Sequence, residues 1–185
     1  MADQIRGFLE QYIQESKTGE MPIHEFAFLD PKTIPFLKEV RDMCEANRCG
    51  MYGRTWTCPP GVGELEVLRD KYQAYEHALL YSTRHELEDS FDFEGMGEGN
   101  KVHHKLDQDL MKKMNTAGFK YALLGAEGCH LCAKCTYPDA PCRNPELVHP
   151  SIEATGVSVV DLSRQAGIRY INGANTVTYF SMILW

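Results

Sequence analysis

All seven cysteines of this 185-residue chain fall into two short arrays, at residues 44–61 and 129–146, and this grouping constrains the fold more than any other feature. The first ten residues lack the charged-then-apolar layout of a secretory signal. We therefore expect a cytoplasmic, reducing setting, in which structural disulfides are disfavoured and clustered thiols indicate metal binding or catalysis. The fold is expected to present two cysteine-rich metal-binding loops.

The second array has the pattern C-x2-C-x2-C-x6-C and consists of Cys129, Cys132, Cys135 and Cys142. Thiolates at every third residue of a compact loop can hold separate iron corners of a cubane, while backbone N–H groups turn toward its sulfides. Zinc sites generally use two distant cysteine pairs instead. The spacing favours an iron-sulfur cluster, with zinc and metal-free thiols as the alternatives. The match to the bacterial ferredoxin run is incomplete, because Pro141 precedes the last cysteine.

The first array has the pattern C-x4-C-x8-C and consists of Cys44, Cys49 and Cys58, with a Pro-Pro-Gly turn directly after it. Seven cysteines cannot give two cubanes four thiolates each. In ferredoxins with two clusters the fourth cysteine of one run binds the other cluster, so Cys142 can belong to either array. One cluster is therefore short of a cysteine.

The incomplete position can be filled in several ways. Water, a nearby His or Asp, a substrate or a partner group can complete it, or the site can hold a three-iron or a fused cluster. An open iron would act as a Lewis acid toward a small molecule. A closed cluster whose last ligand is not cysteine would serve structure or electron transfer.

The two arrays together resemble a known family. The segments Cys44–Gly53 and Thr57–Gly61, followed by Cys129–Cys135 and Pro141–Glu146, resemble predicted metal-binding proteins, domain of unknown function 2284. The resemblance extends from about residue 43 to residue 167. It implies metal binding through the seven matching cysteines and supplies no established reaction.

Apolar periodicity predicts helices and strands that alternate along the chain. Helices are expected at residues 5–13, 36–43, 64–74, 102–118, 151–155 and 161–166. Strands are expected at residues 23–29, 78–81, 119–124, 157–160 and 176–184. Gly95–Gly99 is expected to be a mobile loop, and Asn144–Glu146 to begin a helix that points its positive end at Cys142. The alternation predicts one α/β domain over residues 1–185, with α+β as the alternative, in which helices flank a mixed sheet.

A few other side chains are candidates for roles at the metal sites. His103 and His104 are expected on a helix surface, with a lesser role as the missing ligand of a cluster. Tyr52 and Trp56 are expected either to shield the first site from water or to pack in the core. Arg143 is expected to donate hydrogen bonds to a cluster or to form a surface ion pair.

Composition limits the partners. The net charge of −7 repels phosphate backbones and anionic lipid surfaces, so we expect neither nucleic acid nor a membrane as a partner. The leading hypothesis is an iron-sulfur protein with two [4Fe-4S] clusters that exchanges electrons with a redox partner protein. The alternatives are an enzyme that transforms a small-molecule substrate at an open iron and an interaction module stapled by zinc. No catalytic residue and no oligomeric state can be assigned.

Overall fold

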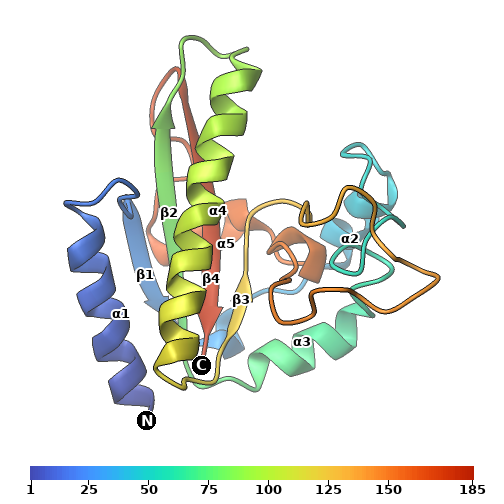
Figure 1. Ribbon diagram of the computed structural model, residues 1–185, viewed down its shortest axis with the longest axis horizontal. Coiled ribbons are helices and arrows are strands. Elements are labelled where there is room, and N and C mark those ends of the chain that lie inside the picture. The colour runs from blue at the N-terminus through green and yellow to red at the C-terminus, as the bar shows by residue number, and fades with distance from the viewer.

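A computed structural model describes residues 1–185 and shows one four-stranded sheet with helices on both faces (Figure 1). The strands lie in the order β1 (Glu25–Leu29), β2 (Ala78–Glu86), β4 (Thr176–Leu184) and β3 (Ala122–Leu124). All three pairs of neighbours are antiparallel, so the expectation of a mixed sheet is wrong. The fold is therefore α+β, which was the alternative to α/β, and the expected flanking of the sheet by helices is confirmed.

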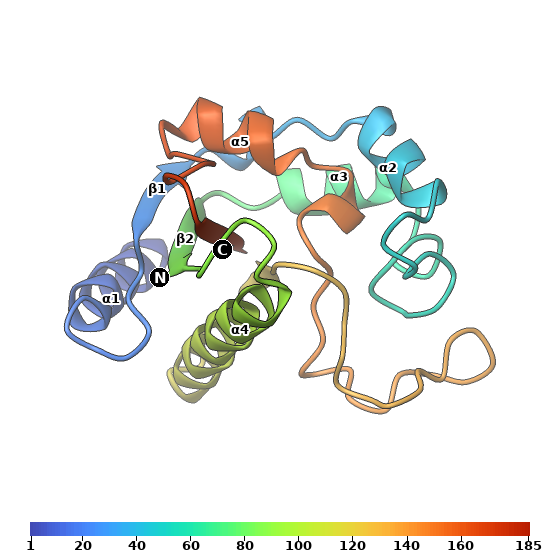
Figure 2. The ribbon, with the colours of Figure 1, turned by 90° about the horizontal axis from the view of Figure 1, so that it is seen from above.

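One face of the sheet is covered by α1 (Ala2–Ser16) and α4 (Phe93–Thr116), which lie together on one side in Figure 2. Alternate residues of a strand point to opposite faces, so Leu79, Tyr81 and Ile183 all project toward these two helices. Their side chains are buried against apolar positions of α1 and α4 that recur at helical spacing.

The opposite face is covered by α3 (Leu65–Gln73) and α5 (Val159–Ala166), seen across the sheet from α4 in Figure 2. Leu80 and Met182, which alternate with the residues of the first face, are buried here. Two short 3-10 helices, η1 (Pro31–Thr33) and η2 (Glu153–Thr155), contact α3 on this face. The alternation of burial along β2 and β4 is what a sheet covered on both sides requires.

Both cysteine-rich loops lie at the β3 edge of the sheet, next to α2 (Lys38–Glu45) (Figures 1 and 2). The first follows α2, whose last turn contains Cys44. The second leaves the sheet after β3 and returns at Ser151, which forms a parallel bridge with Gly125. Because this bridge closes the base of the loop, the segment between its two ends is held over the edge of the sheet.

Three local expectations are wrong. Gly95–Gly99 is helical, because α4 begins earlier than its apolar stripe: the Asp92 side chain accepts a hydrogen bond from the Gly95 N–H and caps the helix. Val157 makes only an isolated bridge with Phe36, and α5 starts at Val159 behind a Ser158 cap, so there is no strand over 157–160. Asn144–Glu146 forms turns rather than a helix.

The longest helix is α4, with 24 residues, and it carries many charged side chains. Neither α4 nor any other helix combines the length and the hydrophobicity that crossing a bilayer needs.

Candidate metal centres

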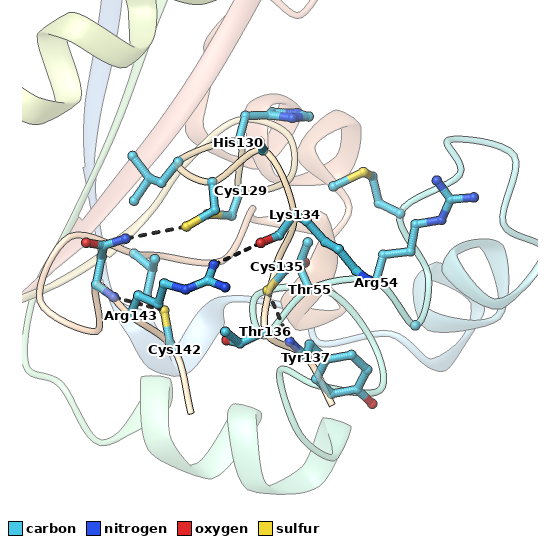
Figure 3. A pocket seen from close by; sticks show the side chains of 17 residues that line it. Arg54, Thr55, Cys129, His130, Lys134, Cys135, Thr136, Tyr137, Cys142 and Arg143 are labelled. Atoms are coloured by element: carbon cyan, nitrogen blue, oxygen red, sulfur yellow. Dashed lines mark hydrogen bonds between the residues drawn. The ribbon is translucent and has the colours of Figure 1, made fainter. Parts of the chain in front are cut away.

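The four cysteines of the second array line one cavity of about 430 Å³ (Figure 3). Cys129, Cys132 and Cys135 come from the compact part of the loop, and Cys142 faces them from its returning arm. The structure thus brings Cys142 together with its own array rather than with the first. This arrangement offers four thiols to one metal centre.

Hydrogen-bond donors point at three of these sulfurs. The Asn144 backbone N–H lies 3.4 Å from the Cys142 sulfur, and the Asn144 side-chain amide lies 3.5 Å from the Cys132 sulfur. The Tyr137 backbone N–H lies 3.5 Å from the Cys135 sulfur. These contacts appear as dashed lines in Figure 3. Donors directed at thiolate sulfur stabilise its negative charge and tune the potential of a bound cluster.

The thiols of this cavity differ in acidity. Partial burial raises the pKa of Cys135, but the backbone N–H groups of Tyr137, Trp56 and Thr136 outweigh it and bring the pKa below the usual range. Burial raises the pKa of Cys129, with a smaller opposing effect from the Leu131 backbone N–H. Because a metal binds the thiolate form, Cys135 is better prepared than Cys129 to become a ligand.

Arg143 does not point at a sulfur. Its guanidinium donates to the Lys134 carbonyl at 2.9 Å, across the loop from its own position (Figure 3). The residue thus ties the returning arm of the loop to the cysteine-bearing arm. No helix dipole acts on Cys142, because the expected helix at Asn144 is absent.

The three cysteines of the first array line a second cavity, of about 540 Å³. The side chains with metal-binding atoms that complete its lining are Glu127, His130 and Glu153. No fourth cysteine lines this cavity. Carboxylate and imidazole groups are therefore the protein ligands available to complete a centre here.

Arg41 holds the first array to the rest of the fold. Its guanidinium donates to the Gly63 carbonyl at 2.8 Å and to the Ala154 carbonyl at 3.2 Å, which fixes the end of the array beside η2. Burial raises the pKa of Cys44, and the Arg41 charge opposes that effect. Burial also raises the pKa of Cys58, against hydrogen bonds from the Thr55 and Thr57 hydroxyls.

The two loops contact each other directly. The Trp56 ring packs edge-on against Tyr137, with 4.9 Å between centroids, and its indole N–H donates to the Ala140 carbonyl at 3.1 Å. Met51 lines both cysteine cavities. Trp56 therefore packs against the second loop, whereas Tyr52 lines the first cavity, as expected for a shielding residue. The two candidate centres are neighbours across a single layer of side chains.

A family model of predicted metal-binding proteins, domain of unknown function 2284, matches residues 27–185. The chain belongs to this family. No curated protein and no solved structure matches it. Metal binding is the property by which the family is described, and in this DUF2284 protein the two cysteine-lined cavities are places where it can occur.

The histidines of this DUF2284 protein are placed differently from expectation. His103 is fully buried rather than on a surface, and burial lowers its pKa to about 3, so its ring is neutral. His104 lines a third cavity together with His149. Neither His103 nor His104 lines the first cysteine cavity, where a fourth ligand is needed.

Sequence reasoning did not single out Glu127 or Glu153, and it misjudged Asn144. Glu127 lines the first cavity with a backbone φ of 59°, a left-handed conformation that no local pattern indicates. Asn144 was taken for a helix start, yet it contacts two sulfurs. An asparagine two residues after a ligand cysteine is a sequence signal for a hydrogen bond to sulfur, because its backbone and side chain can both reach back.

Proposed function

We propose that this protein carries two [4Fe-4S] clusters, one in each cysteine-lined cavity, and transfers single electrons. The observation that carries the proposal is the second cavity, in which four thiols converge and several backbone or amide N–H groups point at sulfur. Cubane clusters are held by four cysteine thiolates, and hydrogen bonds to the sulfurs set their potential. The residues present therefore fit such a cluster.

The separation of the sulfurs supports a cluster over a single zinc ion. Tetrahedral zinc with Zn–S bonds of about 2.3 Å holds its sulfurs about 3.8 Å apart. No three cysteine sulfurs lie within 4.8 Å of one another. The potential ligand atoms that do lie this close belong to other residues. A cubane has its irons at separate corners and accepts sulfurs that are farther apart.

The contact between the loops supports electron transfer. Since Met51 borders both cavities and Trp56 reaches from the first loop to the second, two bound clusters would be close neighbours. Electrons could then enter at one cluster and leave from the other. The exposed second loop would be the surface at which a redox partner protein docks.

Iron and acid-labile sulfide per chain, measured after anaerobic purification, test the proposal. We expect about eight of each, since each cubane contains four irons and four sulfides. Reduction should produce a reversible electron paramagnetic resonance signal. Fewer than ~4 irons per chain contradicts two clusters. A colourless protein that contains zinc and no sulfide supports the zinc-stapled module instead.

A second candidate function is an enzyme that uses an open iron in the first cavity. It is favoured by the three-cysteine lining, because the other possible ligands, Glu127, His130 and Glu153, are carboxylates and an imidazole rather than a thiol. An iron not held by cysteine is the position at which a small molecule binds and is polarised. The substrate would be a small molecule that presents oxygen, nitrogen or sulfur.

Ligand addition separates the two functions. Cyanide or sulfide should change the optical and paramagnetic spectra of an open cluster and leave two closed clusters unchanged. The variant Cys142→Ser assigns the signals, because we expect it to alter the four-cysteine cluster alone. If Cys142→Ser removes the ligand-sensitive signal, Cys142 belongs to the first site and the assignment by cavity is wrong.

A further inference from the structure

A third group of potential ligands lies outside both cysteine cavities. His104, Asp107 and His149 bring one ligand atom each to within 4.8 Å of one another. His104 and Asp107 are three residues apart on α4 and therefore share a face of the helix. His149 approaches from the returning end of the second loop. Bonds of about 2.0–2.2 Å from a metal to nitrogen and oxygen place ligand atoms about 3 to 3.5 Å apart, so small side-chain shifts close the group around an ion.

Asp107 is a buried acid that lacks a positive partner. Its side chain is completely inaccessible, and the nearest histidine nitrogen on the same helix belongs to the neutral His103, at 3.8 Å. A buried carboxylate is costly unless it is paired with a cation or coordinates a metal. A divalent cation between Asp107 and the two histidines would supply the missing positive charge.

Hydrogen bonds hold Asp107 in place while leaving it free to bind. Oδ1 accepts from the Tyr81 hydroxyl at 2.6 Å, and Oδ2 accepts from the Ser181 hydroxyl at 2.8 Å. A carboxylate has about four lone-pair sites, so two acceptor positions are left for a metal. Both donors come from central strands of the sheet, which makes the orientation of the carboxylate rigid.

A chain of hydrogen bonds extends behind Ser181. Because the single Ser181 proton goes to Asp107, the neutral His103 must donate from Nε2 to the Ser181 oxygen, at 2.8 Å. His103 Nδ1 is then an acceptor and receives the Thr83 hydroxyl proton at 2.8 Å. His85 Nε2 in turn donates to the Thr83 oxygen at 2.9 Å. Every donor has one acceptor, as in the outer hydrogen-bond shell that orients metal ligands.

His149 supplies a nitrogen that has no other partner. Its Nδ1 is buried and makes no hydrogen bond. A Cβ on Gly125 would lie 2.7 Å from this nitrogen and 3.4 Å from Asp107 Oδ2. Because glycine has no side chain, His149 and Asp107 can approach each other beside Gly125. Buried polar atoms are normally satisfied, and an orphaned imidazole nitrogen beside a carboxylate fits a metal ligand.

The group opens into a cavity of about 540 Å³ that His104 and His149 line. Lys101 and Lys105 stand on the α4 side of this cavity, and Cys129 and His130 stand on the other. Three protein ligands leave coordination positions that face the cavity. Sites with two histidines and one carboxylate that keep open positions are typical of Fe(II) and related first-row ions.

We propose that His104, Asp107 and His149 bind one divalent first-row transition-metal ion, separate from the cysteine-bound metal and accessible from the cavity between α4 and the second loop. The site goes beyond the proposed electron-transfer function and does not depend on the nature of the clusters. The open positions would take water or an anionic small molecule, which the two lysines would attract.

Manganese(II) is a suitable probe, because it prefers oxygen and nitrogen ligands and competes weakly for the thiolates of the cysteine sites. The anaerobically purified protein, with its native metal content, would be treated with a mild chelator and titrated with Mn²⁺. Loss of the six-line paramagnetic signal of free Mn²⁺ reports binding. The variants are His104→Ala and His149→Ala. Gln108→Ala is the matched control, since it removes a polar side chain from the same cavity but outside the group.

We expect one Mn²⁺ per chain in the wild type and in Gln108→Ala, and binding at least ~10-fold weaker in His104→Ala and His149→Ala. Iron and sulfide contents should be equal in all four proteins, which separates this site from the clusters. Circular dichroism establishes that the variants are folded, and Asp107→Asn adds a third test if it folds. Equal Mn²⁺ binding in all the proteins, or none in the wild type, overturns the proposal.

Discussion

The sulfur of Cys58 lies 3.4 Å from the position that a Cβ on Gly128 would occupy, so the first array touches the residue that directly precedes the second. The same Cβ would lie 3.0 Å from the terminal methyl of Met51, which borders both cysteine cavities. Gly128 lines the first cavity and is packed against Cys58 and Met51. The first centre should therefore be sensitive to the volume of the side chain at residue 128.

Gly128→Val should impair the first centre. The added methyl groups extend beyond the Cβ into the Cys58 sulfur and the Met51 side chain, and Cys58 is buried with little room to yield. We expect iron per chain to fall from about eight to about four, because the four-cysteine centre keeps its ligands. Iron analysis with paramagnetic resonance of each variant is the measurement.

Gly7→Val is the control for this prediction. Gly7 lies on the exposed side of α1, and a Cβ there would meet nothing within 4 Å. Its iron content should equal that of the wild type. A Gly128→Val protein that retains full iron would show that the first centre does not depend on this contact.

The gathering of the cysteines into two groups could be anticipated from spacing, but the group that Cys142 joins could not. Thiols at every third residue restrict a loop to cluster-like geometry whatever surrounds it. Whether Cys142 turns back to its own array depends on the closure of the second loop at its base. That closure rests on the bridge between Gly125 and Ser151, which is a contact between residues far apart in the sequence and leaves no local signal.

The same distinction holds for the fold. The strand at Thr176–Leu184 was predicted with its observed ends, because a long run of apolar and β-branched residues is a local property. The burial of His103 could not be predicted, since it depends on hydrogen bonds between its ring and Thr83 in β2 and Ser181 in β4. The helical state of Gly95–Gly99 depends on the Asp92 cap, which outweighs the low helix propensity of glycine.

Asn144→Ala should lower the reduction potential of the four-cysteine centre. The variant removes the amide donor 3.5 Å from the Cys132 sulfur and keeps the backbone donor to Cys142. The reduced cluster is more negative, so it loses more stabilisation than the oxidised one. One weak hydrogen bond of about 0.5–1.5 kcal/mol corresponds to a shift of about −20 to −60 mV for one electron.

A redox titration followed by paramagnetic resonance measures this shift. Asn172→Ala is the control, since Asn172 hydrogen-bonds with His24 and Thr178, far from the cysteines. An unchanged or higher potential in Asn144→Ala would mean that the amide is not a donor to the cluster.

Acid should destabilise the protein through His103. Burial lowers the pKa of His103 to about 3, whereas an unfolded histidine titrates near 6.5, so between these values only the unfolded chain binds the proton. The stability contributed by the neutral ring is therefore complete above about pH 6.5 and is lost as the pH falls. From pH 7 to pH 5 the loss amounts to about 2 kcal/mol of unfolding free energy.

Urea unfolding at pH 7, 6 and 5 tests this pH dependence. His103→Gln keeps a donor for Ser181 but cannot be protonated. Its urea midpoint should be lower than that of the wild type at pH 7, but it should fall less as the pH is lowered. His24→Gln, at an exposed histidine, should follow the wild type. Parallel pH profiles for the wild type and His103→Gln would show that His103 is not the group responsible.

Ser181→Ala should weaken metal binding at the histidine-carboxylate group without touching a ligand. The Ser181 hydroxyl donates to Asp107 Oδ2 and connects Asp107 by hydrogen bonds to the buried His103. Loss of an orienting outer-shell partner of this kind typically costs 10- to 100-fold in metal affinity, so the Mn²⁺ dissociation constant should rise by about that factor.

Ser82→Ala is the matched control, because Ser82 is equally buried in the sheet but bonds only weakly to the Glu25 carbonyl. Equal Mn²⁺ affinities for the two variants would mean that Asp107 is not held for a metal by this network, since the same hydroxyl volume is lost in both.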